Sequence, residues 1–188
     1  MDGTLIHTTA HDASQQQHQP DGVETVAISD GIVNKRPHVS AFLQRLRDAA
    51  HEVVVFTAAE QGYADEVLDA LDPEKAILRT RYYRDSCVKT KTGYYLKDLG
   101  LLDREMDMRR TVLVDDNWVC HLPQPANGIA IGSFAGRDAG DVELLRVGAL
   151  LDELTAEEDV RAALQARFDL EHELGEWRAM VEGGGHTG

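Results

Sequence analysis

The run from Val112 to Val114, which ends in Asp115, Asp116 and Asn117, constrains the fold of this chain more than any other stretch. A short apolar run bounded by polar residues indicates a strand buried on both faces, as in parallel sheets. Ligands of open α/β sheets bind at the carboxyl ends of such strands. Two adjacent carboxylates repel each other there unless a hard cation such as Mg²⁺ binds between their oxygens and a phosphate. The simpler alternative is a turn or a helix cap.

A second apolar run, Val53 to Phe56, ends in Thr57, which predicts a second buried strand with a hydroxyl at its carboxyl end. This Thr either binds a ligand or caps the following helix. The other elements expected from periodicity and turn signals are a hairpin at 23–33 turning at Asp30-Gly31, helices at 37–50 and 63–71, a hairpin at 89–95, an edge strand at 127–131 and acidic helices within 141–179. Helix 37–50 carries its apolar face on Val39, Phe42, Leu43 and Leu46, and the acidic helices carry theirs on Leu144, Leu145, Val147, Leu150, Leu151 and Leu154.

Composition limits the classes of protein that this chain can belong to. Its 188 residues suit one domain, and its formal net charge of −14 opposes non-specific binding to nucleic acid or to an anionic membrane. No run approaches the ~18 apolar residues of a membrane span. The two cysteines, Cys87 and Cys120, form no disulfide framework, so we expect small core or half-buried thiols and a reducing compartment.

Two polar stretches have competing interpretations. Residues 79–87 are dense in basic and aromatic side chains, including Arg84, and either bind a phosphate or form a solvated surface. Lys97, taken without its context, is predicted to be an ordinary surface lysine. Residues 10–22 are polar and of low complexity, which predicts a flexible loop with solvated His11 and His18.

The order of the polar groups carries more information than any one of them. Asp2-Gly3-Thr4-Leu5, a strand ending in Thr57, then Lys97, then a strand ending in Asp115-Asp116 form the set of parts needed for phosphoryl transfer through an aspartyl phosphate. This order resembles the haloacid dehalogenase superfamily. The segments at 35–43, 55–58, 63–65, 84–88 and 95–99 look like its small phosphatases that act on the RNA polymerase II C-terminal domain, the NIF-like or FCP-homology branch.

The resemblance implies a three-layer α/β fold with a parallel sheet and a small inserted β-hairpin. It covers residues 1–135, and we expect residues 136–188 to add acidic helices and a frayed tail packed on the same domain. It also implies a phosphoserine or phosphothreonine protein substrate, no direct nucleic-acid binding, Mg²⁺ as cofactor and a nuclear or cytoplasmic location. The substrate protein and the oligomeric state stay open.

The same resemblance implies roles for individual residues. Asp2 would protonate the leaving oxygen and later activate water, and Thr4 would support its loop. The other roles are phosphate binding by Thr57, Lys97 and Arg84, Mg²⁺ binding by Asp116 with Asp115 and Asp2, and a substrate pocket formed by Tyr63, Val26 and Ile28.

The chain departs from the family pattern at its first residue. The family motif is Asp-x-Asp-x-Thr, and Met1 occupies the x position. The nucleophilic aspartate and the first central strand would therefore precede Met1, so we expect the chain as written to be inactive. The two explanations are a start misassigned to an internal methionine, which we favour, and a truncated product.

An alternative function is a non-catalytic binding module. The receptor subunit of the mitochondrial inner-membrane translocase uses the same fold to bind presequences, which would imply a mitochondrial location. Such a subunit needs a membrane anchor and a targeting peptide; neither pattern occurs in this sequence, but a segment ahead of Met1 could hold both. A third, weaker alternative is a pure adaptor.

Overall fold

The computed structural model describes residues 1–10, 22–102 and 105–175. Its strands are β1 (Ile6–Ala10), β2 (Thr25–Ile28), β3 (Gly31–Lys35), β4 (Val54–Phe56), β5 (Thr80–Tyr82), β6 (Val88–Lys89), β7 (Tyr95–Leu96), β8 (Leu113–Asp115) and β9 (Gly128–Ala130). Its α-helices are α1 (Val39–Asp48), α2 (Gln61–Leu71), α3 (Glu143–Leu154), α4 (Val160–Phe168) and α5 (Leu170–Glu173). Short 3₁₀ helices are η1 (Arg84–Ser86), η2 (Leu99–Leu101), η3 (Trp118–His121) and η4 (Pro125–Asn127).

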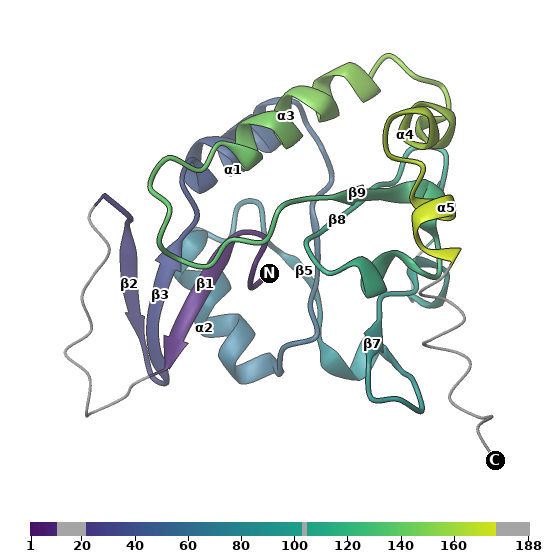
Figure 1. Ribbon diagram of the computed structural model, residues 1–188. Helices are drawn as coiled ribbons and strands as arrows, with labels where there is room; N and C mark the ends of the chain where they lie inside the picture. Colours follow the sequence, from purple (N-terminus) through teal and green to yellow (C-terminus); the bar gives the residue numbers. More distant parts are fainter. Residues whose placement is uncertain (11–21, 103–104, 176–188) are drawn as a thin grey trace.

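An antiparallel sheet of order β1-β3-β2 lies on one side of the molecule (Figure 1). The predicted hairpin is confirmed, but its turn is Ser29-Asp30, because Ile28 pairs with Gly31. Strand β1, which the sequence did not predict, pairs with β3 over the whole of its length. The predicted loop with His11 and His18 lies almost entirely outside the described residues.

Two parallel strand pairs form the α/β part of the fold. Strand β4 pairs with β5, and β8 pairs with β9. Strand β5 begins only after the apolar segment 76–78, because the Asp72 carboxylate accepts hydrogen bonds from the backbone N–H groups of Ala76, Ile77 and Leu78. These bonds hold the segment in a turn and satisfy donors that would otherwise be buried.

A cleft of about 500 Å³ separates the two parallel pairs. Within the described ranges, β4 pairs only with β5 and β8 pairs only with β9, and residues 53–56, residues 111–114 and Met1 line the cleft. We call it the β4–β8 cleft. The expectation that both strands are buried on both faces is therefore wrong in part, since Val54, Leu113 and Val114 are only half-buried.

Helices α1 and α3 lie next to each other on one side of the parallel strand pairs (Figure 1). The predicted apolar face of α1 is confirmed, with Val39, Phe42, Leu43 and Leu46 all buried. The predicted face of α3 is confirmed except for Leu145, which is 42% exposed because it lies about 100° around the helix from Leu144. Residues of α3 and α4 share one apolar core with Ile6 and β4.

The burial of the two cysteines agrees with the prediction from the sequence. Cys87 is half-buried and Cys120 is buried, and both are free thiols, as the sequence predicted. In the described part of the chain, no helix is both long and apolar enough to cross a membrane.

Candidate active site

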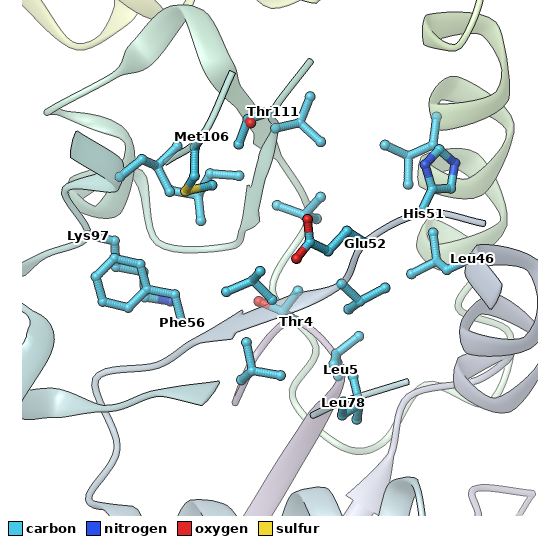
Figure 2. Close-up of a pocket in the computed structure, with 18 of the residues that line it drawn as sticks. Thr4, Leu5, Leu46, His51, Glu52, Phe56, Leu78, Lys97, Met106 and Thr111 are labelled. Carbon is cyan, nitrogen blue, oxygen red and sulfur yellow. The ribbon is translucent and has the colours of Figure 1, made fainter. Parts of the chain in front are cut away.

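The carboxyl ends of β4 and β8 lie beside the N-terminal loop of the chain. Thr57 follows β4 directly, and Asp115 is the last residue of β8 rather than the first residue after it. The backbone of Gly3 accepts a hydrogen bond of 2.7 Å from the N–H of Phe134, just beyond β9. Figure 2 shows Phe56 and Lys97 toward one end of the β4–β8 cleft and His51 toward the other.

Lys97 and Asp115 form a buried ion pair, in which Lys97 Nζ donates to Asp115 Oδ2. Each residue is 3% exposed, so the surface-lysine alternative is wrong. Burial alone would lower the pKa of Lys97, but the adjacent Asp115 carboxylate, together with Cys120 and Cys87, raises it above its usual value. Burial likewise works against ionisation of Asp115, yet Lys97 holds the pKa of this carboxyl below its usual value. Both groups are charged at neutral pH.

Asp116 faces a different set of partners. Its Oδ1 accepts a 2.8 Å hydrogen bond from Thr4 Oγ1, and its Oδ2 accepts a 2.9 Å bond from Ser133 Oγ. Successive side chains of an extended segment point to opposite sides, which explains why Asp115 and Asp116 diverge. Sequence reasoning missed Ser133, which lies two residues beyond the predicted edge strand 127–131.

The close approach of Asp116 to the N-terminal loop requires a glycine at position 3. Gly3 has a φ of +75°, in the left-handed region that disfavours side chains. A Cβ atom there would lie 2.1 Å from Asp116 Oδ2. The Asp2-Gly3-Thr4 turn therefore places its backbone directly against the second acid of the pair.

The carboxylate of Asp2 is held by Tyr63. The Tyr63 hydroxyl lies 3.0 and 2.9 Å from the two carboxylate oxygens, and the Thr8 N–H lies 3.2 Å from Oδ1. The Tyr63 hydroxyl also forms a hydrogen bond with Thr8 Oγ1. Burial raises the pKa of Tyr63 far above its usual value, so the phenol stays protonated and donates. Sequence reasoning missed Thr8, because β1 was not predicted.

Arg36 fixes the other side of the N-terminal loop. Its guanidinium is 1% exposed and donates to the carbonyl oxygens of Gly3 and Thr4, at 3.1 Å each, and of Gly132, at 2.7 Å. It also donates to both carboxylate oxygens of Asp141, at 2.9 and 2.8 Å. No local pattern singles out Arg36, since all of these partners except the loop itself lie about a hundred residues away.

Thr57 and Arg84 lie together at the end of β4. Thr57 is 4% exposed, and its Oγ1 accepts a 3.1 Å hydrogen bond from the Ala59 N–H, as in a turn. Arg84 donates to the Ala58 carbonyl at 2.7 Å and pairs with Glu60 at 2.7 Å. The structure therefore brings Arg84 next to Thr57, with its charge partly satisfied by Glu60.

The predicted substrate-pocket residues belong to two neighbouring elements. Tyr63 on α2 and Val26 and Ile28 on β2 are partly buried against the same apolar core. Ser29, in the turn after β2, donates from N and Oγ to Glu66 on α2, at 2.8 and 2.7 Å. These bonds hold the hairpin against the helix that carries Tyr63.

The carboxylates of the site do not form a complete metal site by themselves. The described residues contain no group of three or more His, Cys, Asp or Glu side chains positioned to share a metal ion. Asp2 faces Tyr63, Asp115 faces Lys97, and Asp116 faces the backbone of the Asp2-Gly3-Thr4 turn. This donor set supplies fewer ligands than the six oxygens that Mg²⁺ prefers.

The fold and the residues at its strand ends define a haloacid dehalogenase-like α/β protein. The family model of NLI interacting factor-like phosphatases matches residues 1–161, and the chain belongs to this family. A solved structure of the fission yeast RNA polymerase II CTD phosphatase Fcp1, bound to beryllium fluoride, matches with a TM-score of 0.51. It is 19% identical, and the match covers 94% of this chain and 53% of that one. The predicted family and fold are confirmed.

Curated relatives extend the comparison. The probable C-terminal domain small phosphatase of Dictyostelium discoideum is 40% identical, over 87% of this chain and 52% of the relative. The human carboxy-terminal domain RNA polymerase II polypeptide A small phosphatase 2 is 39% identical, over 87% and 58%. CTD nuclear envelope phosphatase 1B of Danio rerio is 36% identical, over 87% and 68%. The chain thus spans about half of the first of these relatives.

Proposed function

We propose that this chain is the catalytic part of a serine/threonine phosphoprotein phosphatase that works through an aspartyl phosphate, with an aspartate directly ahead of Met1 as nucleophile. The observation that carries the proposal is the meeting of Lys97, Asp116 and the Asp2-Gly3-Thr4 turn at the carboxyl ends of the parallel strands. The family match and the phosphatase names of the relatives support it.

Lys97 and Thr57 would bind the phosphoryl group. Lys97 carries three N–H donors, of which Asp115 accepts one, and its buried ammonium would act strongly on phosphoryl oxygens. The Thr57 hydroxyl donates to the same oxygens in this proposal while it continues to accept from the Ala59 N–H. Donors fixed before the substrate arrives stabilise the developing charge without the cost of reorganisation.

Asp2 would move the proton. The Tyr63 hydroxyl and the Thr8 N–H orient its carboxyl group, so that it can protonate the leaving serine or threonine oxygen and then take a proton from water. Tyr63 also lies next to the β2–β3 hairpin, where Val26 and Ile28 would contact an apolar side chain of the substrate.

Magnesium is part of this proposal through Asp116. The Asp116 carboxylate and the carbonyl oxygen of Asp2 would be the ligands from this chain, although the described side chains do not complete a site. Asp115 is excluded as a direct ligand in the proposal, because it is buried and paired with Lys97. When bound, the ion would reduce the repulsion between the acids and a phosphate. We propose a nuclear or cytoplasmic location for the protein.

The test compares three forms of the protein on para-nitrophenyl phosphate and on a phosphoserine peptide. These are the 188-residue chain, a form extended by Val-Leu-Val-Leu-Asp ahead of Met1, and the same extension ending in Asn. Only the Asp-terminated form should hydrolyse either substrate, and Lys97→Ala should abolish its activity. Equal activity of the Asp and Asn forms would contradict the assigned nucleophile.

A further inference from the structure

The chain concentrates basic side chains in one segment, although the protein is acidic overall. Residues 79–97 include six basic residues and one acidic residue, against a net charge of −14 for the whole chain. Two of the six, Arg81 and Lys97, are largely buried in ion pairs. Lys89 and Lys91 are exposed and form no ion pair with the acids that the structure describes. A positive surface on an acidic protein favours an anionic ligand.

Lys89 and Arg84 are held against the same aromatic ring. Arg84 Cζ lies 5.5 Å and Lys89 Nζ lies 5.6 Å from the centroid of the Tyr95 ring, within the range of cation–π contacts. Lys89 is also the cross-strand partner of Tyr95 in the β6–β7 hairpin. We call these three residues the Tyr95 cluster. The ring keeps two positive charges close to each other, and an anion bound beside them would relieve their repulsion.

The turn of the hairpin keeps this cluster in place. The Thr90 N–H donates to the Tyr94 carbonyl at 2.8 Å, and the Thr90 hydroxyl accepts from the Tyr94 N–H at 3.0 Å. Gly93, with a φ of +93°, donates its N–H to the Thr90 carbonyl at 3.1 Å. The loop that leads into β7 projects from the body of the molecule (Figure 1). A surface that is ordered before its ligand arrives avoids part of the entropy cost of binding.

The Tyr95 cluster adjoins the candidate active site. Lys97 directly follows β7, and residues two apart on an extended chain share a face, so Tyr95 and Lys97 lie on the same side. Arg84 Nε donates to the carbonyl of Ala58 at 2.7 Å, and Ala58 directly follows Thr57. An extended peptide advances about 3.3 Å per residue. A peptide with its phosphoserine at Lys97 and Thr57 would therefore pass the cluster within a few residues.

The two cations of the cluster are available to a ligand. Arg84 pairs with Glu60 at 2.7 Å, but the two side chains are 42% and 76% exposed, so solvent screens this pair. Lys89 has the Tyr95 ring as its neighbour and no acid among the described residues. An anionic side chain arriving here would meet one weakly paired cation and one unpaired cation.

We propose that the Tyr95 cluster binds a second anionic side chain of the substrate, a carboxylate or a phosphate, close in sequence to the phosphoserine or phosphothreonine that is dephosphorylated. Lys89 determines the preference for this anion, and Tyr95 positions Lys89. The assignment rests on the proposed phosphatase function and adds a substrate class to it, namely phosphoprotein segments with an acidic or a second phosphorylated residue nearby.

Fluorescence anisotropy tests the site without catalysis, on the 188-residue chain and on the Asn-terminated extension. Labelled peptides carry one central phosphoserine and a second residue, which is Glu, phosphoserine, Gln or Lys, at each position up to about four residues away on either side. At one or more positions the Glu peptide should bind about fivefold more tightly than the Gln peptide at low salt. Whichever of Glu and phosphoserine binds more tightly identifies the anion that the cluster prefers.

Variants identify the residue that makes the contact. Lys89→Ala should remove the preference for Glu over Gln, and Lys89→Glu should reverse it in favour of the Lys peptide. Tyr95→Phe keeps the ring and should retain the preference, whereas Tyr95→Leu should reduce it. The matched control is Arg79→Ala, which removes a charge from the same basic segment at the other end of β5, where Arg79 donates to the Lys75 carbonyl. This control should keep the preference.

Two results would overturn the proposal. The first is no difference between the Glu and Gln peptides at any position. The second is an equal loss of the preference in Lys89→Ala and Arg79→Ala, which would show unspecific attraction to the basic segment. Neither result depends on hydrolysis. An inactive Asp-terminated form would therefore contradict the proposed function and leave this binding test valid.

Discussion

Asp115 and Asp116 are neighbours in sequence but belong to two regions with different physical properties. The region around Asp115 and Lys97 is buried, and each of these two oppositely charged residues is 3% exposed. The region around Asp116 is formed by the Gly3 backbone and by the hydroxyls of Thr4 and Ser133. One carboxylate thus neutralises a buried lysine, while the other is held by neutral donors beside a turn.

The difference shows how an acidic pair can serve two purposes. A buried ion pair is costly to break, because the remaining charge stays in a low-dielectric environment. A half-buried carboxylate that accepts from two hydroxyls keeps lone pairs for a cation. We therefore expect replacement of Asp115 to affect mainly stability, and replacement of Asp116 to affect mainly ligand binding.

The largest effect is expected when the buried Lys97–Asp115 ion pair is broken. Lys97→Met leaves the Asp115 carboxylate buried without its cation, which should lower the free energy of unfolding by about 3–5 kcal/mol. Adding Asp115→Leu to Lys97→Met should recover most of that loss. Urea unfolding followed by circular dichroism measures both, and a loss under about 1 kcal/mol for the single variant would contradict a buried, tightly coupled pair.

The next largest effect is expected when the N-terminal turn loses the hydrogen bonds that Arg36 donates to it. Arg36→Met removes donors from the Gly3, Thr4 and Gly132 carbonyls and leaves Asp141 unpaired, which should cost about 3 kcal/mol. The matched control is Arg45→Met. Arg45 pairs with Asp152 at the surface, where both side chains are more than 40% exposed, and its loss should hardly change the free energy of unfolding because solvent screens the pair. Equal destabilisation in urea would show that burial does not distinguish these two pairs.

A smaller change sharpens the comparison at the turn itself. Gly3→Ala combines left-handed backbone strain with a collision against Asp116, and should destabilise the protein by about 1–3 kcal/mol. Gly93→Ala is the control, since Gly93 has a φ of +93° and an added Cβ would meet nothing within 4 Å. Thermal unfolding should show a larger loss of stability for Gly3→Ala than for Gly93→Ala. The difference between the two losses measures the cost of the collision with Asp116.

The smallest expected effect concerns Mg²⁺. At a free concentration about ten times the dissociation constant, the ion should stabilise the protein by about 1.4 kcal/mol. Asp116→Ala should abolish this increment, whereas Asp115→Asn should reduce it less. Calorimetric titration and unfolding with and without Mg²⁺ measure the increment separately from basal stability. The reverse order would mean that Asp115, not Asp116, holds the ion.

Several parts of the fold follow from local patterns. The apolar spacing of Val39, Phe42, Leu43 and Leu46 determines the buried face of α1, because a helix repeats every 3.6 residues. The polar residues that end the apolar runs at Thr57 and Asp115 mark the edge of the sheet where the site lies. The order of the Asp2–Leu5 turn, Thr57, Lys97 and Asp115-Asp116, together with the segments at 35–43, 55–58, 63–65, 84–88 and 95–99, predicted the family by resemblance.

Other features depend on contacts between distant parts of the chain. The buried bond network of Arg36 joins it to Asp141, 105 residues away, and the partner of Asp116 at Thr4 is 112 residues away. Strand β1 forms by pairing with β3, and this pairing also positions Thr8 against Tyr63. Sequence alone determined which chemical groups follow the strands, since this depends on local order. Only the tertiary structure decided which of them face each other, because a hydrogen bond depends on position and direction in space.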